Sequence, residues 1–231
     1  MALAGDAFLA LWNDIAAGRE AEYDQWHTRE HVPERVAVAG FAGARRYVQR
    51  ARARHRYFTL YEVADEAVLA HAEYADLVQH PTPWSASMRP DFRHFLRAAC
   101  RVRASVGEGI GAALAIACYV HADAPRVADA VDALRQAPGV VGCHLGERAP
   151  EPPPAWVAGA RDAAVRAFDR VLLIEALDRE AAAAALAHAR ELAGLAEVGA
   201  DSGGDVYDVA FIFPGHAPHE RLRHRRAHWD P

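Results

Sequence analysis

Apolar runs of strand length alternate with helical segments along the first half of the chain. The runs that we expect to form strands span residues 7–14, 44–50, 56–63 and 95–105. The helical segments between them span residues 19–32 and 66–77. The first helix should end near Pro33, because a proline there lacks a backbone donor and would clash with the carbonyl of Arg29. The predicted order is β-α-β-β-α-β.

Local signals refine the second helix of this half and the segment after it. Asp65 stands where an N-cap is expected, since its carboxylate can accept hydrogen bonds from the first backbone N–H groups of the helix. The following stretch HPTPWSASMRP, residues 80–90, is interrupted by prolines. It therefore cannot be one regular helix.

The same order of elements recurs in the second half. Gly107, Gly109 and Gly111 predict a flexible joint between the two halves. Strands are expected over residues 112–121, 140–147, 168–176 and 206–213. Helices are expected over residues 125–136 and 179–196, and a Pro-rich stretch separates the second and third of these strands. The halves share little sequence, so the repeat is architectural.

Burial of the sheets decides how the halves should associate. Each half can cover one face of its sheet with two helices, which leaves the other face apolar and wet. We therefore predict an α+β fold of two tandem ferredoxin-like (βαββαβ) halves, residues 1–106 and 107–215, packed sheet to sheet as an α+β barrel within one chain. Residues 216–231 form an Arg- and His-rich tail that we expect to be loosely held.

Composition and charge exclude several classes of function. The net charge of −5 argues against general binding to nucleic acid or to anionic membranes, both of which need a basic field. No apolar run approaches the roughly 18 residues of a membrane span. The three cysteines form no CxxC pair, and we expect them to be buried thiols without a disulfide. These features predict a cytoplasmic protein.

A family resemblance rests on the segment EYDQWHTREHVPERVAVAGFAGARRYV. Its Trp26, His31-Val32-Pro33, Gly40-Phe41 and Arg46-Tyr47 resemble the EthD-like branch of the dimeric α+β barrel superfamily. The later run EYADLVQHPTPWSASMRPDF also looks like bacterial relatives of this group. The resemblance covers roughly residues 7–100, and Ala39-Gly40 stands where the family often has Pro-Gly.

The resemblance implies a range of activities rather than one. Relatives in the superfamily include cofactor-free lactone isomerases, polyketide cyclases, small monooxygenases and haem-handling proteins. Such proteins commonly place their pocket between the sheet and the helices. Because one fold serves many functions, the function has to be argued from the site.

The spacing of His27 and His31 admits a metal site. Residues 27–31 read H-x-x-E-H, the inverted zinc-protease signature, and Glu108 could be proposed as a third ligand. Pro33 argues against this reading, because a zinc-binding helix has to hold both histidines rigidly. Glu108 also stands between two glycines of the expected joint. We therefore expect no bound metal.

Acid–base chemistry at His31 is the stronger hypothesis. We expect its imidazole to titrate near neutrality, where a proton-transfer group is useful. His27 would assist, and the hydroxyl of Tyr47 could polarise a carbonyl group. Asn13, Trp26, Arg46 and Trp84 are candidate substrate-binding residues. The competing interpretation is that His31 only caps its helix.

A cluster of arginines follows the expected site. If the chain is extended there, Arg50, Arg52, Arg54 and Arg56 project on one side and could bind a phosphate or a carboxylate. We favour a solvated hairpin over this ligand site.

Two functions stay open at this point. The first is a cofactor-independent isomerase, cyclase or oxygenase acting on a small, largely apolar carbonyl compound. The second is a non-catalytic binding or assembly module with the same fold. The expected partner is a small-molecule ligand rather than nucleic acid or a membrane, and the sequence leaves a homodimer open.

Overall fold

The fold is seen in a computed structural model, which describes residues 2–120, 124–150, 168–193 and 204–215. The end of the last expected helix, most of the Pro-rich stretch and the tail 216–231 lie outside the described residues. None of the helices in the described part is long and apolar enough to cross a membrane.

Eight antiparallel strands close into a barrel. Around the barrel their order is β1-β3-β2-β8-β5-β7-β6-β4. The strands are β1 (Ala7–Ile15), β2 (Phe41–Val48), β3 (Tyr57–Val63), β4 (Phe92–Gly107), β5 (Ala113–Tyr119), β6 (Val140–Arg148), β7 (Arg170–Ala176) and β8 (Asp205–Pro214). Within each half the two strands at the centre are the first and the third, which is the ferredoxin-like order. The seams between the halves are the pairs β2–β8 and β4–β6.

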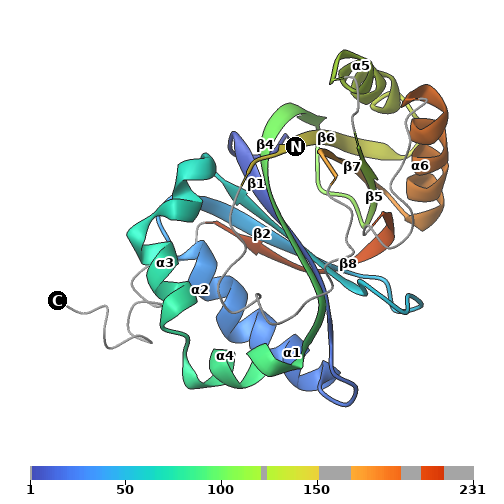
Figure 1. The fold of residues 1–231 in the computed structure, drawn as a ribbon. Coiled ribbons are helices and arrows are strands. Elements are labelled where there is room, and N and C mark those ends of the chain that lie inside the picture. The colour runs from blue at the N-terminus through green and yellow to red at the C-terminus, as the bar shows by residue number, and fades with distance from the viewer. Residues whose placement is uncertain (1, 121–123, 151–167, 194–203, 216–231) are drawn as a thin grey trace.

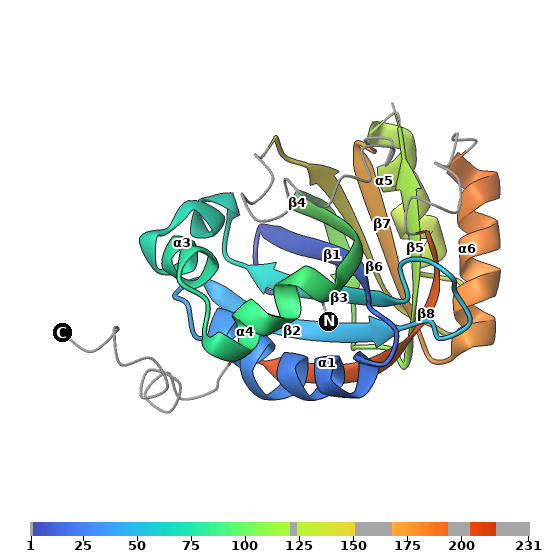
Figure 2. The ribbon, with the colours of Figure 1, turned by 60° about the horizontal axis from the view of Figure 1, so that its bottom comes forward.

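The helices cover the outside of the barrel in two groups. They are α1 (Glu20–Trp26), the π-turn η1 (His27–His31), α2 (Val32–Val36), the 3-10 turn η2 (Glu66–Ala70), α3 (Ala72–Gln79), α4 (Pro83–Met88), the 3-10 turn η3 (Arg89–Asp91), α5 (Ala124–Leu134) and α6 (Arg179–Ala193). Figures 1 and 2 show α1 to α4 against the sheet of the first half and α5 with α6 against the sheet of the second.

The predicted packing of sheet against sheet is confirmed. Apolar side chains from both halves meet inside the barrel in one buried cluster that includes Trp12 and Phe58 of the first half and Ile116 and Leu173 of the second. Further clusters lie between each sheet and its own helices. The division of the chain at residues 106 and 107 stays a prediction, which a fragment experiment below addresses.

Strand β1 shows how both faces of a strand are buried. Phe8, Ala10 and Trp12 point into the barrel, whereas Ala7 and Leu9 pack under the helices. This explains why the run AFLALWND is almost continuously apolar rather than alternating. The alternation places Leu11 and Asn13 on the face that the helices cover.

The sequence predicted that the first helical segment would end near Pro33, and this prediction is wrong. Helical structure continues to Val36, because a π-turn precedes the proline. In this turn the backbone N–H of Val32 donates to the carbonyl of His27, five residues earlier. Pro33 then occupies the first turn of α2, where a missing N–H costs little.

The helix expected over residues 66–77 is interrupted. Asp65 is the N-cap as predicted, and its carboxylate accepts hydrogen bonds from Ala67 and Val68. The turn η2 then stops at His71, whose backbone is extended, and α3 begins at Ala72. Residues 80–90 are two short helices rather than one, in agreement with the prediction.

The arginines between β2 and β3 do not form an extended ridge. Residues 49–56 are a loop, so the side chains have separate partners. Arg52 donates to the carbonyl of Gly204 and pairs with Asp205 at 2.9 Å. Arg56 lies 3.5 Å from the buried carboxylate of Asp14. This agrees with the hairpin interpretation that we favoured rather than with a row of parallel guanidinium groups.

The cysteines are buried and free, as predicted. Cys118 lies on β5 and Cys143 on β6, and β7 stands between these two strands in the barrel. Burial raises the pKa of the Cys143 thiol to about 12. This thiol is consequently protonated and unreactive at neutral pH.

Candidate functional site

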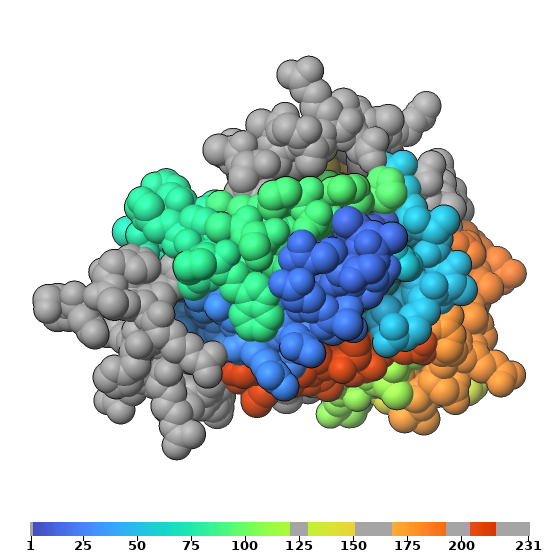
Figure 3. Space-filling view, turned by 90° about the horizontal axis from the view of Figure 1, so that it is seen from below, coloured from blue at the N-terminus to red at the C-terminus, as the bar shows by residue number. Residues whose placement is uncertain are grey.

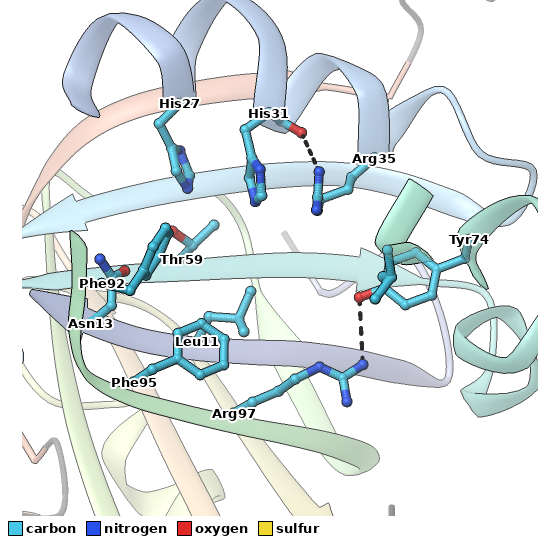
Figure 4. A pocket seen from close by; sticks show the side chains of 11 residues that line it. Leu11, Asn13, His27, His31, Arg35, Thr59, Tyr74, Phe92, Phe95 and Arg97 are labelled. Atoms are coloured by element: carbon cyan, nitrogen blue, oxygen red, sulfur yellow. Dashed lines mark hydrogen bonds between the residues drawn. The ribbon is translucent and has the colours of Figure 1, made fainter. Parts of the chain in front are cut away.

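A small cavity lies between the sheet of the first half and the helices that cover it. Its volume is about 40 Å³. Residues from β1, β3, β4, the π-turn, α2 and α3 surround it (Figure 4). The lining residues are Leu11, Asn13, His27, His31, Arg35, Thr59, Tyr74, Val78, Phe92, Phe95 and Arg97.

The π-turn presents two imidazoles to this cavity. The ring centres of His27 and His31 are 5.0 Å apart, and Figure 4 shows both rings hanging from the helix toward the sheet. The ring of Tyr23 lies 5.2 Å from His27, and the ring of Trp26 lies 4.2 Å from His31. Aromatic neighbours therefore hold the pair in place and keep water away from one side of it.

Both histidines are neutral at physiological pH. Burial lowers the pKa of His27 well below its usual range, and the positive charges of Arg46 and Arg35 lower it further. Burial likewise lowers the pKa of His31, with Arg35 as the largest charged contribution. Because burial and then the neighbouring cations lower the pKa of His31, the expected titration near neutrality is wrong. A neutral imidazole can accept a proton.

Three buried polar atoms around the cavity have no hydrogen-bond partner within the described residues. They are Nδ1 of His27, Nδ1 of His31 and Oγ1 of Thr59. Buried polar groups are nearly always paired, so such a group calls for a bound water or ligand. Finding three of them on one small cavity marks it as a place that binds something polar.

Asn13 is fixed by its neighbours at one end of the cavity. Its amide oxygen accepts a hydrogen bond of 3.0 Å from the hydroxyl of Tyr23, and its amide nitrogen donates to the carbonyl of Asp14. Burial raises the pKa of Tyr23 to about 12, so this hydroxyl remains a donor at physiological pH. The amide is therefore held in one orientation.

The other end of the cavity carries two guanidinium groups. Arg35 follows His31 by four residues and donates to its carbonyl at 3.3 Å. Arg97 reaches in from β4 and donates to the hydroxyl of Tyr74 at 3.5 Å. Figure 4 shows Arg35, Tyr74 and Arg97 at the same end, away from Asn13. The cavity is thus cationic at one end.

Trp26 and Trp84 do not line the cavity, although the sequence suggested them as substrate-binding residues. The indole of Trp26 donates to Ser85 at 3.1 Å, and that of Trp84 donates to Glu22 at 3.2 Å. Both contacts join α4 to α1. These tryptophans hold the helical layer together above the site, on the face that Figure 3 shows in blue and green.

Arg46 and Tyr47 lie on opposite faces of β2. Arg46 pairs with Asp24 at 2.5 Å on the helix side of the sheet, where its charge acts on His27. Tyr47 points into the barrel, and its hydroxyl lies 3.4 Å from a carboxylate oxygen of Glu175. The structure therefore does not bring Tyr47 together with the histidines.

The two glutamates considered for a zinc site, Glu30 and Glu108, have partners other than the histidines. Glu30 accepts hydrogen bonds from Thr82 at 2.5 Å and from Ser85 at 3.0 Å, so it faces α4 rather than the histidines. Glu108 is exposed and lies 3.5 Å from Arg135 of the second half. Within the described residues no group of three His, Cys, Asp or Glu side chains is arranged to hold a metal ion.

Several residues that line the cavity were not predicted from the sequence. Thr59 is the one aliphatic hydroxyl in the run YFTLYEV, and a small polar residue at a buried strand position was a usable signal. Arg35 could have been found from its position four residues after His31, which places both on one helix face. Arg97, Tyr74, Phe92 and Phe95 carry no local signal, since only the tertiary fold brings them to the cavity.

Comparisons by sequence find no matching family model and no matching curated protein. Comparison of folds does find solved structures with a similar fold. A Fusobacterium nucleatum protein described as a "putative monooxygenase" superposes with a TM-score of 0.58 at 12% identity, over 92% of this chain and 96% of its own. An "anthrone oxidase-like protein" gives a TM-score of 0.57 at 10% identity, over 94% of this chain and 97% of its own.

A third solved structure, described as a "putative chlorite dismutase", gives a TM-score of 0.56 at 11% identity. It is matched over 91% of this chain and 96% of its own. At this level of identity the likeness shows the fold alone. The chain has the architecture of the dimeric α+β barrel proteins, with two ferredoxin-like halves closing the barrel within one chain.

Proposed function

We propose that the protein is a small-molecule enzyme of the EthD-like kind, which performs cofactor-independent acid–base chemistry on a small carbonyl compound at the cavity of His27 and His31. The observation that carries the proposal is the pair of neutral imidazoles, His27 buried and His31 partly buried, with inaccessible and unpartnered Nδ1 atoms on one cavity. A scaffold histidine in such a place would be expected to spend its ring nitrogens on hydrogen bonds.

The chemistry that suits this arrangement is proton abstraction next to a carbonyl group. Neutral His31 takes the proton, the electron pair of the broken C–H bond moves onto the carbonyl oxygen, and an enolate results. The hydroxyl of Thr59 lies on the cavity and can donate to that oxygen, in the role that the sequence assigned to Tyr47. The lower dielectric of the buried site strengthens this hydrogen bond.

The fate of the enolate separates the reaction types. Return of the proton from His31 to a different carbon isomerises the substrate, whereas attack of the enolate carbon on a second carbonyl group closes a ring. In an oxygenase the enolate carbon would instead form a C–O bond to dioxygen, and the resulting peroxide would take the proton back from His31 to give a hydroperoxide. All three begin with the same proton transfer, so that first step is the one to test.

A non-catalytic binding module is the second candidate, and the size of the cavity favours it. A volume of about 40 Å³ holds two or three water molecules, so a larger ligand has to displace side chains. In that case the histidines would only donate and accept hydrogen bonds.

Exchange of hydrogen for deuterium next to a carbonyl group tests the proposal. Ketones, 1,3-diketones and 2-oxo acids are incubated in D₂O with the wild-type protein, and label uptake is followed by NMR. We expect at least one compound to exchange faster with the protein present. His31→Gln should abolish the acceleration, whereas His188→Gln, on the exposed surface of α6, should not.

No acceleration for any compound that binds to the cavity would contradict the enzyme proposal and favour the binding module.

A further inference from the structure

The side chains that line the cavity are cationic or neutral. Arg35 and Arg97 reach it from the helix and from the sheet, and the lining includes no Asp or Glu. Arg35 pairs only loosely with a carboxylate, that of the neighbouring residue Glu34 at 3.9 Å. Other buried arginines of the first half have closer partners. Arg46 lies 2.5 Å from Asp24, and Arg45 lies 2.6 Å from Glu62.

The hydrogen-bonding geometry of Arg35 leaves room for a ligand. Its guanidinium has five N–H donors, of which one makes a long hydrogen bond of 3.3 Å to the carbonyl of His31 and lies 3.9 Å from the carboxylate of Glu34. Arg35 is 9% exposed and lines the cavity. A buried guanidinium without a close carboxylate suits an anionic ligand.

We propose that the cavity recognises the carboxylate of its substrate, with Arg35 and Arg97 binding the anionic group and the histidines facing the adjacent carbon atoms. This proposal rests on the proposed function above and assigns the class of substrate: a small carboxylic acid with an apolar body. The hydroxyl of Tyr74 lies between the two guanidinium groups in Figure 4 and supplies a further donor.

The effect of the arginines on the histidines supports the assignment. Arg35 is among the charges that lower the pKa of both His27 and His31, which means that its positive charge is felt at the imidazoles. A bound carboxylate would offset this charge. The pKa of His31 would then rise, and the imidazole would become a stronger base only when the substrate is present.

The size and lining of the cavity restrict the rest of the molecule. About 40 Å³ accommodates the anionic head but not a larger body. Phe92 and Phe95 line the same cavity and are only partly buried, so an apolar body can pack against them. A body larger than the cavity requires these rings to move.

Binding of matched acids and amides tests the proposal. Acetate, hexanoate and benzoate are compared with acetamide, hexanamide and benzamide by calorimetry on the full-length protein. We expect at least one acid to bind about tenfold or more tightly than its amide, as a charge-assisted contact predicts. Arg35→Gln should remove this preference, Arg35→Lys should keep part of it, and Arg135→Gln on the exposed surface should leave it unchanged.

NMR of the His31 ring gives a second readout that does not depend on affinity alone. Bound benzoate should raise the pKa of His31, and benzamide should not. If Arg35→Gln does not fold, Arg97→Gln is compared in the same way.

Equal binding of acids and amides, or an acid preference that survives both Arg35→Gln and Arg97→Gln, would overturn the proposal. Different results refute the enzyme proposal and the proposal of carboxylate recognition. Exchange of neutral ketones by a protein without acid preference would leave the enzyme proposal intact and refute carboxylate recognition. Tight binding of acids without exchange of any compound would support recognition and refute the enzyme.

Discussion

The carbonyl oxygen of His27 accepts a hydrogen bond from the backbone N–H of Val32, five residues further along the chain. This π-turn bonding widens the helix by one residue at the point where both imidazoles face the sheet. π-turns are rare, and they occur frequently at functional sites. Pro33 follows at once and supplies no competing N–H, which favours the wider turn over a regular helix.

Stability should fall in mild acid, because four buried or partly buried histidines are held in the neutral form. The pKa of His55 is lowered to about 4 and that of His144 to about 3, and the pKa values of His27 and His31 are also lowered. In the unfolded chain each would titrate near 6.5. Below that pH the unfolded state binds more protons than the folded state, so the free energy of unfolding decreases as the pH falls.

The expected loss at pH 5 is roughly 2 kcal/mol for each of His55 and His144, and His27 and His31 should add to it in the same direction. Urea unfolding at pH 7.5, 6.5, 5.5 and 5.0 measures it. A free energy of unfolding that stays constant over this range would show that the four imidazoles are accessible to protons in the folded protein.

The barrel contains a buried charge network around Arg45. Its guanidinium pairs with Glu175 and lies 2.6 Å from Glu62, and all three side chains are buried. The second oxygen of Glu175 accepts a hydrogen bond of 2.8 Å from Gly111. Arg45→Met would leave two buried carboxylates without their cation, which should destabilise the fold by about 3–5 kcal/mol.

The exposed pair of Arg103 and Glu147 is the matched control for this network. Arg103→Met should cost at most about 1 kcal/mol, because solvent screens the pair. Urea unfolding of both variants makes the comparison. Similar losses for Arg45→Met and Arg103→Met would mean that the barrel interior is open to water.

A fragment of residues 1–106 should not remain a well-behaved monomer. Removing the second half uncovers the inner face of the first sheet, including Trp12 and Phe58, and frees the seams of β2 and β4. Exposed apolar surface and open strand edges drive association. Analytical ultracentrifugation should show a dimer or an aggregate. A stable monomer would mean that each half folds without the other.

Much of the fold follows from the sequence, because strand-length apolar runs and turn residues are local signals. All eight strands lie where such runs predicted them, with ends displaced by a few residues. The π-turn was not predictable from the same signals, since a proline after a helical run normally indicates an end. The break at His71 was missed for a related reason, because no glycine or proline stands there to mark it.

The candidate site could be predicted only in part from the sequence. Asn13, His27 and His31 lie on the cavity, but Arg46 and Tyr47 are neighbours on one strand and must point to opposite faces. The strand pattern did not decide which of the two faces the helices. A register shift between Arg46 and Tyr47 in the pairing with β8 further obscures the alternation. Arg97 and Tyr74 come from distant segments and required the fold.

The role of His31 in chemistry rather than in the scaffold is tested most directly by one comparison of His31→Gln with the wild-type protein. Both proteins are assayed for deuterium exchange with a compound that the wild type labels, and both are melted in the same buffer. His31 has an unpartnered Nδ1, so the substitution should change the melting temperature by no more than about 2 °C and abolish the exchange. A much larger drop in melting temperature, or exchange at the wild-type rate, would contradict a proton-transfer role for His31.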